Sequence, residues 1–272
     1  MSFLPELAER EATGEKARIF AEMRRLGGVP MVALIFRHLA TLPGGIEWAW
    51  GALGPAWKAG RVQEAAWRIA DEAALEPLTP IPPEALAALG VDGAALREIR
   101  VVLRAYNLAN PENLLSVLCL TRLLGGASAA QPTEARDWNP PPAPGPLVPM
   151  IDVSRAPKEV AALLDLVATP GDGGGPRLVQ SLYRHFGNRP AFLALVVTLL
   201  LPRIRDGSVA MAAAGIRMKM DDAAHGLVRS MSAPLAPHPG VRSALERFGG
   251  NVIPQMIVIG ALLEAGVGSG SE

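Results

Sequence analysis

The stretch Tyr183-Arg184-His185-Phe186 repeats an earlier stretch of the chain, Phe36-Arg37-His38-Leu39, at an offset of 147 positions (183 minus 36). The same offset pairs Pro43 with Pro190, Leu53 with Leu200, Pro55 with Pro202, Gly60 with Gly207 and Ile69 with Ile216. Because this register continues without a gap, the matches indicate an internal duplication. The sequence therefore predicts two similar halves, each of which needs the other to cover its apolar faces.

The matching extends into the rest of each half at a slightly shorter offset. Pro111 aligns with Pro254 at an offset of 143 (254 minus 111), and the apolar run Leu114–Leu124 then aligns with Ile257–Leu263. Proline and glycine are common in this chain, so single matches mean little, but these continue a register that is already established. The predicted duplication thus covers most of the sequence.

Proline dominates the segment between the two copies. Gly125–Pro149 contains Pro140-Pro141-Pro142, and proline fixes φ and removes backbone donors, so the segment should be extended. It is either a flexible linker between independent domains or an ordered strap between two halves of one unit. The strap is favoured because apolar side chains able to dock interrupt the prolines at Leu147, Val148, Met150 and Ile151. The predicted organisation is a first helical repeat over 1–124, a Pro-rich linker over 125–158 and a second helical repeat over 159–272, forming one compact intrachain pseudo-dimer.

The periodicity of the apolar residues is mostly that of helices. Apolar residues three to four apart predict helices over Glu15–Leu26 and Val62–Leu75. Helices starting at proline are predicted over Pro30–Leu39 and Pro176–Phe186. The run Phe192–Leu201 also suits a strand, but its repeat partner Ile46–Leu53 has helical spacing, which decides for a buried helix. No alternating run bounded by Asn-Gly or Asp-Gly turns occurs, so the expected fold class is all-α.

Composition excludes several classes of protein. The 272 residues include 26 Lys and Arg against 26 Asp and Glu, whereas a nucleic-acid or acidic-membrane binder needs an excess of positive charge. The apolar run Phe192–Leu201 is shorter than the roughly 17–25 residues of a membrane span. The first residues carry Glu6 and Glu9 and lack the pattern of a signal peptide. We expect a cytoplasmic protein with neither nucleic-acid nor membrane partners.

No metal or cofactor is expected either. The sequence contains no P-loop, dinucleotide-binding, nucleophile-elbow or His-Glu-x-x-His motif. His38 and His185 provide half of a zinc site at most, and solvated helix positions are the favoured interpretation. Of Asp221 and Asp222, at most one can face a pocket, and a surface helix end is favoured. Cys119 lies in an apolar run and is interpreted as a small buried residue.

A group of amides precedes the first apolar run. The segment Tyr106–Leu115 contains Asn107, Asn110 and Asn113, and Asn110 stands directly before Pro111, where it is well placed to cap a helix. The other amides either bind a ligand between the halves or satisfy loop backbone, and the second interpretation is favoured for Asn107. Asn110 is retained as a candidate binding residue.

The two stretches Val29-Pro30-Met31-Val32-Ala33-Leu34-Ile35-Phe36-Arg37 and Val179-Gln180-Ser181-Leu182-Tyr183-Arg184, with the Pro-rich segment between them, resemble the group I 2-haloacid dehalogenases over nearly the whole chain. The resemblance implies an all-helical protein of two homologous halves joined by a long proline-rich loop, with the active site between them. It also implies that water displaces halide directly from 2-haloalkanoic acids, without a covalent ester.

This chain departs from the family at the positions of the family's catalytic and substrate-binding residues. Met31, Ala33 and Leu34 stand where the family has Trp, Asn and Phe, and Leu182 stands at the position of the Asp that activates water. Leucine cannot accept a proton, and general-base catalysis contributes typically 10²–10⁴-fold. The candidate site implied by the resemblance consists of Leu182 at the catalytic position and, for substrate binding, Met31, Leu34, Ile35, Asn110, Gln180 and Ser181.

Three functions fit these observations. The first is a haloacid dehalogenase-like hydrolase whose activity is weak, altered or lost. The second is a non-catalytic binding protein that uses the apolar cavity between the halves for a small hydrophobic or carboxylate ligand. The third is an interaction protein whose exposed helices assemble into an oligomer, for which a homodimer is the simplest form.

Overall fold

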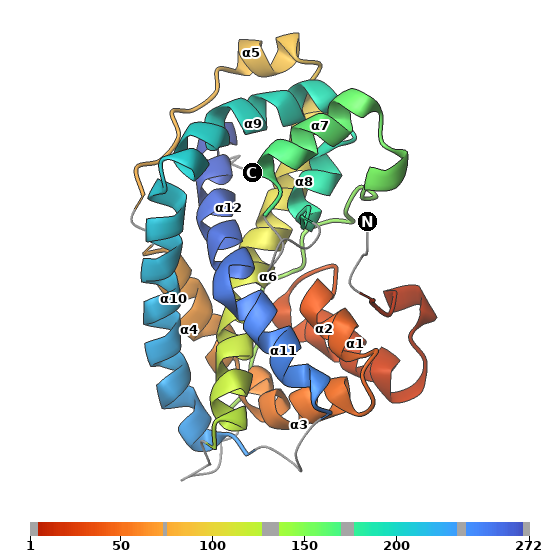
Figure 1. Ribbon diagram of the computed structural model, residues 1–272, viewed down its shortest axis with the longest axis vertical. Helices are drawn as coiled ribbons and strands as arrows, with labels where there is room; N and C mark the ends of the chain where they lie inside the picture. Colours follow the sequence, from red (N-terminus) through yellow and green to blue (C-terminus); the bar gives the residue numbers. More distant parts are fainter. Residues whose placement is uncertain (1–4, 73–74, 127–135, 170–176, 233–237, 269–272) are drawn as a thin grey trace.

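The helix α6 (Gly93–Leu124), 32 residues long, runs through the centre of the molecule (Figure 1). Asp92 caps its start by accepting a hydrogen bond from the Ala95 amide at 2.8 Å. Its C-terminal half is apolar on nearly every side and is buried between α4 (Arg61–Ala70), α10 (Ser208–Leu227) and α12 (Ile253–Val267). A helix that is apolar all round needs such a central position.

The computed structural model describes residues 5–72, 75–126, 136–169, 177–232 and 238–268. Within these ranges every regular element is a helix, apart from one isolated β-bridge between Thr169 and Leu178. The remaining α-helices are α1 (Gly14–Gly27), α2 (Leu34–Leu39), α3 (Gly45–Lys58), α5 (Pro83–Ala88), α7 (Lys158–Val167), α8 (Ser181–Phe186), α9 (Pro190–Arg205) and α11 (Gly240–Arg247). The π-helix η5 (Phe248–Val252) joins α11 to α12. The all-α fold is therefore observed in the described residues.

Helix boundaries follow the offset found in the sequence. Both the first and the last residue of α8 stand 147 positions after those of α2. The last residues of α3 and α9, Lys58 and Arg205, are also 147 positions apart. Both α4 and α10 start directly after a glycine with positive φ, Gly60 at 69° and Gly207 at 82°, a conformation that favours glycine. The agreement concerns the order and bounds of the helices, and the duplication itself remains a prediction.

One hydrophobic cluster joins the two halves of the chain. It contains Trp57 and Leu114 from the first half together with Phe192 and Ile259 from the second, all of them buried. A shared cluster means that neither half covers its apolar faces alone.

The described part of the Pro-rich segment lies against the helices. Trp138 stacks near Trp67, with ring centroids 5.9 Å apart, and its Nε1 donates to the Leu26 carbonyl at 2.8 Å. Further along, Leu147, Val148 and Ile151 pack on the hydrophobic cluster. These contacts agree with an ordered strap. Residues 127–135, part of the same segment, lie outside the described residues.

Several predicted helix ends are wrong. The helix expected to start at Pro30 starts at Leu34, and the helix expected from Pro176, which lies outside the described residues, starts at Ser181. In both cases the residue directly before the helix, Ala33 or Gln180, is extended, and tertiary contacts hold the segment before it. Glu9 accepts a hydrogen bond from the Val32 amide at 2.8 Å, and the bridge between Thr169 and Leu178 holds the second segment. The helix expected over Val62–Leu75 ends at Ala70.

The cap predicted at Asn110 is also wrong, since α6 continues through Pro111. Proline at this position removes one backbone donor from the helix, a cost that packing on several sides offsets. Asn110 is consequently a residue in the middle of a helix. Asn107, expected in a loop, instead donates to the Glu264 carboxylate of α12 at 2.7 Å.

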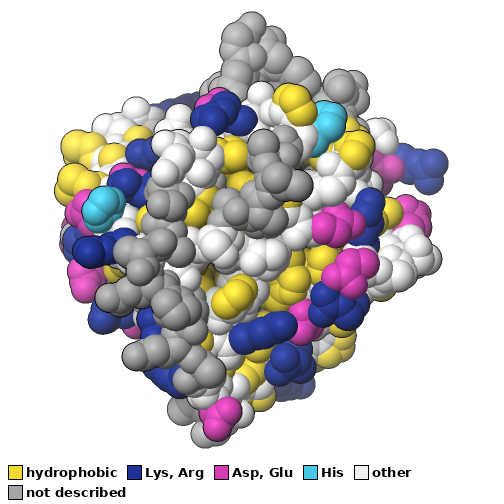
Figure 2. Space-filling view, turned by 90° about the horizontal axis from the view of Figure 1, so that it is seen from below, with side chains coloured by type: hydrophobic (Ala, Val, Ile, Leu, Met, Phe, Trp, Pro, Cys, Tyr) yellow, Lys and Arg dark blue, Asp and Glu magenta, His cyan; other side chains and the backbone are white. Residues whose placement is uncertain are grey.

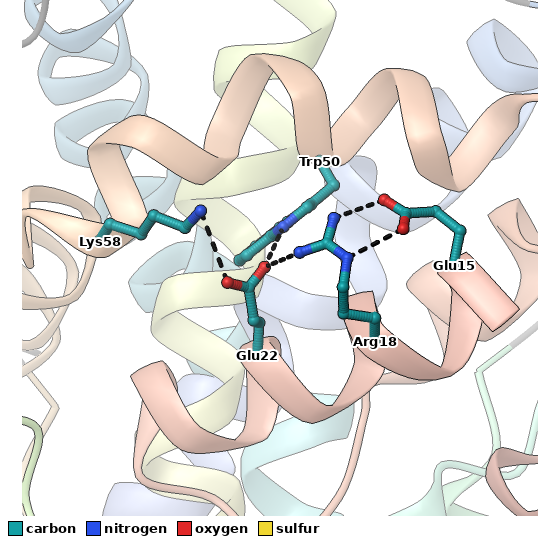
Figure 3. A network of polar contacts seen from close by, with 5 residues as sticks. All are labelled: Glu15, Arg18, Glu22, Trp50 and Lys58. Atoms are coloured by element: carbon teal, nitrogen blue, oxygen red, sulfur yellow. Dashed lines mark hydrogen bonds and ion pairs between the residues drawn. The ribbon is translucent and has the colours of Figure 1, made fainter.

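A polar network ties α1 to α3 outside the core (Figure 3). Glu22 accepts hydrogen bonds from Trp50 Nε1 at 2.9 Å and from Arg18 at 3.0 Å, and it pairs with Lys58 at 3.4 Å. Arg18 also pairs with Glu15. Burial raises the pKa of Glu22, but the Trp50 hydrogen bond and the positive charges of Lys58 and Arg18 outweigh it, so the pKa is lowered.

The surface carries interspersed charges. On the coloured part of the face shown in Figure 2, acidic and basic side chains lie interspersed among apolar ones. One stretch, Gly240–Val267, is long and apolar enough to pass a length and composition test for a membrane span. Of its most apolar window, 61% is buried inside the protein, where α12 packs against α6. Core helices of globular proteins pass the same test.

Candidate functional site

A cavity of about 430 Å³ lies between α2 and α8, with α6 and α12 contributing further wall residues. Figure 1 places α2 and α8 on the same side of α6, one below the other. All seven residues that the sequence singled out line this cavity: Met31, Leu34, Ile35, Asn110, Gln180, Ser181 and Leu182. The structure therefore brings together side chains that are more than 140 positions apart in the chain.

Leu182 and Ile35 form matching apolar positions of the wall. Each is the second residue of its short helix, each is 1% exposed, and they are related by the offset of 147. Both helices follow an extended residue, Ala33 with ψ 149° and Gln180 with ψ 145°, so the chain turns into the helix at the cavity edge. The position that the resemblance assigns to the base is thus a buried leucine on the cavity wall.

Two carboxylates line the cavity within the described residues, and both are engaged. Glu6 accepts from Arg37 Nε at 2.9 Å and from Arg37 Nη2 at 2.6 Å. Asp152 accepts from the Ser154 hydroxyl at 2.7 Å and the Ser154 amide at 2.9 Å, and these hydrogen bonds lower the pKa of its carboxyl. A carboxylate stabilised in its ionised form is a weaker base. Both carboxylates therefore already accept hydrogen bonds from neighbouring side chains or backbone.

Four arginines reach the same cavity and differ in their partners. Arg37 is held by Glu6 and by the Val32 carbonyl at 2.7 Å, and Arg177 pairs with Asp165 at 3.4 Å.

Arg184 donates through Nε to the Ile151 carbonyl at 3.2 Å, and among the described residues no carboxylate pairs with it. Arg247 is exposed, whereas Arg184 is partly buried. Arg184 is therefore the partly buried cavity cation that remains available for an anion.

Polar residues of α6 form one stripe on the cavity wall. Tyr106, Asn110 and Asn113 are spaced by four and three positions, which places them on one helix face. Tyr106 and Asn113 were not among the predicted site residues, because the local sequence around Asn110-Pro111 has the features of a helix start. The spacing of these residues by four and three positions, continued across Pro111, is the signal in the sequence that would have identified them.

Among the described residues, two buried polar atoms on the wall have no hydrogen-bond partner: Asn110 Nδ2 and Gln180 Oε1. Gln180 uses its amide nitrogen on the Thr169 hydroxyl, which leaves the oxygen free. An unsatisfied buried donor or acceptor costs roughly 1–3 kcal/mol. A ligand or water in the cavity that bonded these atoms would therefore be stabilised.

The interpretation of the two paired histidines as solvated is wrong. His38 is 9% exposed and His185 is 5% exposed. Each uses Nδ1 on a backbone carbonyl, His38 on Pro5 at 2.7 Å and His185 on Val148 at 2.6 Å. The reason is tertiary: an extended segment covers each short helix and offers its carbonyl oxygen.

The other titratable candidates lie away from the cavity. Asp221 pairs with Arg122 at 2.6 Å, and neither Asp221 nor Asp222 lines the cavity. Burial raises the pKa of the Cys119 thiol to about 12, as expected for an inert buried residue. Among the described residues, no group of three or more His, Cys, Asp and Glu is placed to hold a metal.

The fold and the site define a class: all-helical proteins with a small, mostly apolar cavity between two short helices and an arginine available for an anion. The chain is 31% identical over 210 residues to a configuration-inverting 2-haloacid dehalogenase of Alcaligenes xylosoxydans xylosoxydans, a match that spans 74% of this chain and 69% of that protein. No protein-family model matches the chain.

Solved structures show the same fold. A D-2-haloacid dehalogenase in complex with L-LA superposes with a TM-score of 0.71 at 16% identity, covering 97% of this chain and 94% of that one. A D-2-haloacid dehalogenase mutant in complex with D-2-CPA gives a TM-score of 0.66 at 17% identity, covering 97% and 90%. On the sequence match, this chain belongs to the group I 2-haloacid dehalogenase family.

Proposed function

We propose that the chain binds a small 2-substituted carboxylic acid in the cavity between α2 and α8, and that its hydrolytic dehalogenation is weak, altered or lost. The observation that carries this proposal is Leu182, a buried leucine on the cavity wall at the position of the family's base, in a cavity whose described carboxylates, Glu6 and Asp152, are both engaged. The cavity can therefore bind the acid although, among the described residues, it has no dedicated carboxylate base to activate water.

Arg184 is the proposed partner of the substrate carboxylate. Its guanidinium has one hydrogen bond to a backbone carbonyl and no acidic partner among the described residues. A planar guanidinium suits a carboxylate well because it can donate two parallel hydrogen bonds. A cavity of about 430 Å³ is at the small end of ligand pockets, which suits acids such as 2-chloropropionate and lactate, the kind that relatives bind.

The reaction at issue is a direct displacement. The oxygen of a water attacks C2 from the side opposite the halogen, the carbon–halogen bond breaks with its electrons leaving on the halide, and a 2-hydroxy acid forms with inverted configuration. The water must lose a proton, which is the step that Leu182 cannot assist. Met31, Leu34 and Ile35 supply the apolar wall beside the reacting carbon.

We also propose that the two halves are homologous copies. Matched bounds of α2 and α8, and glycines of positive φ before α4 and α10, support this. A superposition of residues 15–124 on 159–265 tests it, and unlike helix order or handedness between the halves would contradict it.

The test of function measures binding and halide release in the same preparations. Titration calorimetry with 2-chloropropionate should detect binding to the wild type, while chloride release should be slow or undetectable. The variant Leu182→Asp should gain at most a weak rate, because the apolar wall raises the pKa of a buried carboxyl and Met31 and Ala33 leave the substrate poorly positioned. Leu182→Asn is the matched control and should gain nothing.

Absence of binding would overturn the proposal that the cavity binds the acid. Rapid turnover by the wild type would overturn the proposal that its dehalogenation is weak, altered or lost. A non-catalytic binding protein is the second candidate, favoured by the apolar wall around Leu182. It predicts that the wild type binds the acid without any halide release, even from 2-bromopropionate, whose halide leaves more easily.

A further inference from the structure

We propose that Tyr106 and His185 form a proton relay that takes the proton from the attacking water, in place of the missing carboxylate. This inference rests on the proposed function, because it names the base for the same reaction. It assigns a residual rate to two side chains that the resemblance does not point to. Both lie in the described part of the chain and on different elements, Tyr106 on α6 and His185 on α8.

The relay is visible as a chain of contacts that starts at the cavity. Tyr106 lines the cavity, and its hydroxyl lies 3.2 Å from His185 Nε2. The two rings meet edge-on, with centroids 5.6 Å apart and planes at 60°. Behind the imidazole, His185 Nδ1 lies 2.6 Å from the carbonyl oxygen of Val148 in the strap. Ser181 also lies on the cavity wall.

The direction of these hydrogen bonds follows from the carbonyl at the end of the chain. A carbonyl oxygen only accepts, so His185 Nδ1 must carry a proton. In the neutral imidazole, Nε2 then has a lone pair, and the Tyr106 hydroxyl donates to it. The Tyr106 oxygen can in turn accept a proton from the cavity side. The strap thus fixes the imidazole in the tautomer that a base requires.

The surroundings keep both groups neutral at neutral pH. Burial lowers the pKa of His185 and Arg184 lowers it further, although the Val148 hydrogen bond acts in the opposite direction. Burial raises the pKa of Tyr106 to about 12, so the phenol stays protonated. The charged groups that face this pair are Arg37, Glu6 and Arg184 near Tyr106, and the ion pair of Glu98 with Arg189 beside His185.

The proposed step is balanced without any further reactant. As the water oxygen bonds to C2 and the halide leaves with the bonding electrons, one water proton passes to the Tyr106 oxygen. The Tyr106 proton passes at the same time to His185 Nε2. The products are the 2-hydroxy acid, the halide and a protonated His185, which returns its proton to solvent. His185 also lines a second cavity of about 260 Å³.

The chain itself offers matched controls. His38 stands 147 positions before His185, is similarly buried, and uses Nδ1 on the Pro5 carbonyl, but it does not line the cavity. Tyr183 is a fully buried tyrosine whose hydroxyl has no partner in the described part of the chain, and it does not line the cavity either. Tyr183→Phe and His38→Gln therefore control for loss of a buried hydroxyl and of a buried imidazole.

The experiment measures bromide release from 2-bromopropionate at high protein concentration, together with calorimetric binding of the same acid. Tyr106→Phe and His185→Gln should each lower the release rate by roughly 10²-fold or more, the usual contribution of a general base. Tyr106→Phe should bind the acid with nearly wild-type Kd, and the two control variants should keep the wild-type rate within a few-fold.

Two further readouts separate a relay from a structural role. The wild-type rate should fall in acid as His185 is protonated, with a midpoint below the ordinary 6.5, and this limb should disappear in His185→Gln. In ¹⁵N spectra of the four histidines, His185 should be the neutral Nδ1–H tautomer, and its Nε2 resonance should shift in Tyr106→Phe and not in Tyr183→Phe.

Each outcome decides between the inferences. Unchanged bromide release in Tyr106→Phe overturns the relay. Binding without any bromide release in the wild type also overturns the relay while leaving the proposed binding function intact. Absence of binding overturns the proposed function itself. Loss of release in Tyr106→Phe with binding, tautomer pattern and both controls as stated supports the relay.

Discussion

The two sides of the cavity are built alike but hold their arginines differently. On one side the N-terminal segment covers α2: Leu7 donates its amide to the Arg37 carbonyl at 3.0 Å, and Pro5 offers its carbonyl to His38. On the other side the strap covers α8 with the same pattern. Ile151 donates its amide to the Arg184 carbonyl at 3.1 Å, and Val148 offers its carbonyl to His185.

The difference lies in what each covering segment brings to the arginine. The N-terminal segment carries Glu6, which pairs with Arg37. The strap has Pro149 and Met150 in the corresponding stretch, and Arg184 receives only a carbonyl oxygen. One guanidinium is therefore neutralised and the other is available. Near-identical local geometry therefore leaves one arginine without an ion-pair partner, because Glu6 pairs with Arg37 whereas Asp152, the carboxylate of the strap, accepts hydrogen bonds from Ser154.

The largest expected effect concerns the anchoring of the strap. Trp138→Ala should lower the free energy of unfolding by about 3 kcal/mol, since it removes ring packing and a hydrogen bond. Hydrogen exchange should become faster at the Ile151 amide and stay unchanged at the Leu7 amide. Trp138→Phe keeps a ring and loses only the hydrogen bond, so its free energy of unfolding should fall by about 1 kcal/mol. Equal changes at both amides would show that the two covering segments are not independent.

The next effect concerns the free arginine. Arg184→Met keeps the apolar stem and removes the charge, and it should weaken 2-chloropropionate binding roughly 10- to 100-fold, as expected for a lost hydrogen bond to a charged group of about 1.5–3 kcal/mol. Arg37→Met should weaken binding much less, because Glu6 already neutralises Arg37. Calorimetric Kd values for the two variants give the answer. A larger loss of affinity in Arg37→Met than in Arg184→Met would show that Arg37, and not Arg184, binds the carboxylate.

A smaller effect should follow from making the two sides equal. Glu6→Gln removes the acidic partner of Arg37 and should tighten 2-chloropropionate binding up to about fivefold, because it adds a second available cation; stability should change by less than about 1 kcal/mol. The gain should vanish in the double variant Glu6→Gln with Arg37→Met. A gain that persists there would have to come from elsewhere.

The smallest effect lies outside the cavity, in the network of Glu22 between α1 and α3. The folded pKa of Glu22 is lowered, so its contribution to stability is present above the unfolded pKa, near 4.3, and disappears as pH falls through the folded value. The free energies of unfolding of the wild type and Glu22→Gln, measured by urea titration, should differ by about 1 kcal/mol or less at pH 7 and converge towards pH 3. A gap that persists at pH 3 would mean that the carboxylate charge is not its cause.

Local sequence determined much of the fold. Apolar residues at helical spacing predicted α1 and α3, and the repeat partner decided for a helix at α9. The offset of 147 also relates the observed bounds of α2 and α8. The family resemblance assigned Ile35 and Leu182 to the candidate site, and both line the cavity. These features depend on periodicity and on side-chain identity, which are properties of the chain itself.

Tertiary structure decided what local rules left open or placed wrongly. Pro111 and Asn110 have the local features of a helix start, yet burial on several sides keeps α6 continuous and turns Tyr106, Asn110 and Asn113 into one cavity face. The burial of His185 and the pairing of Arg37 depend on segments more than thirty positions away. No local pattern encodes such contacts, because long-range packing and hydrogen bonds set a side chain's charge state and partners only after the chain has folded.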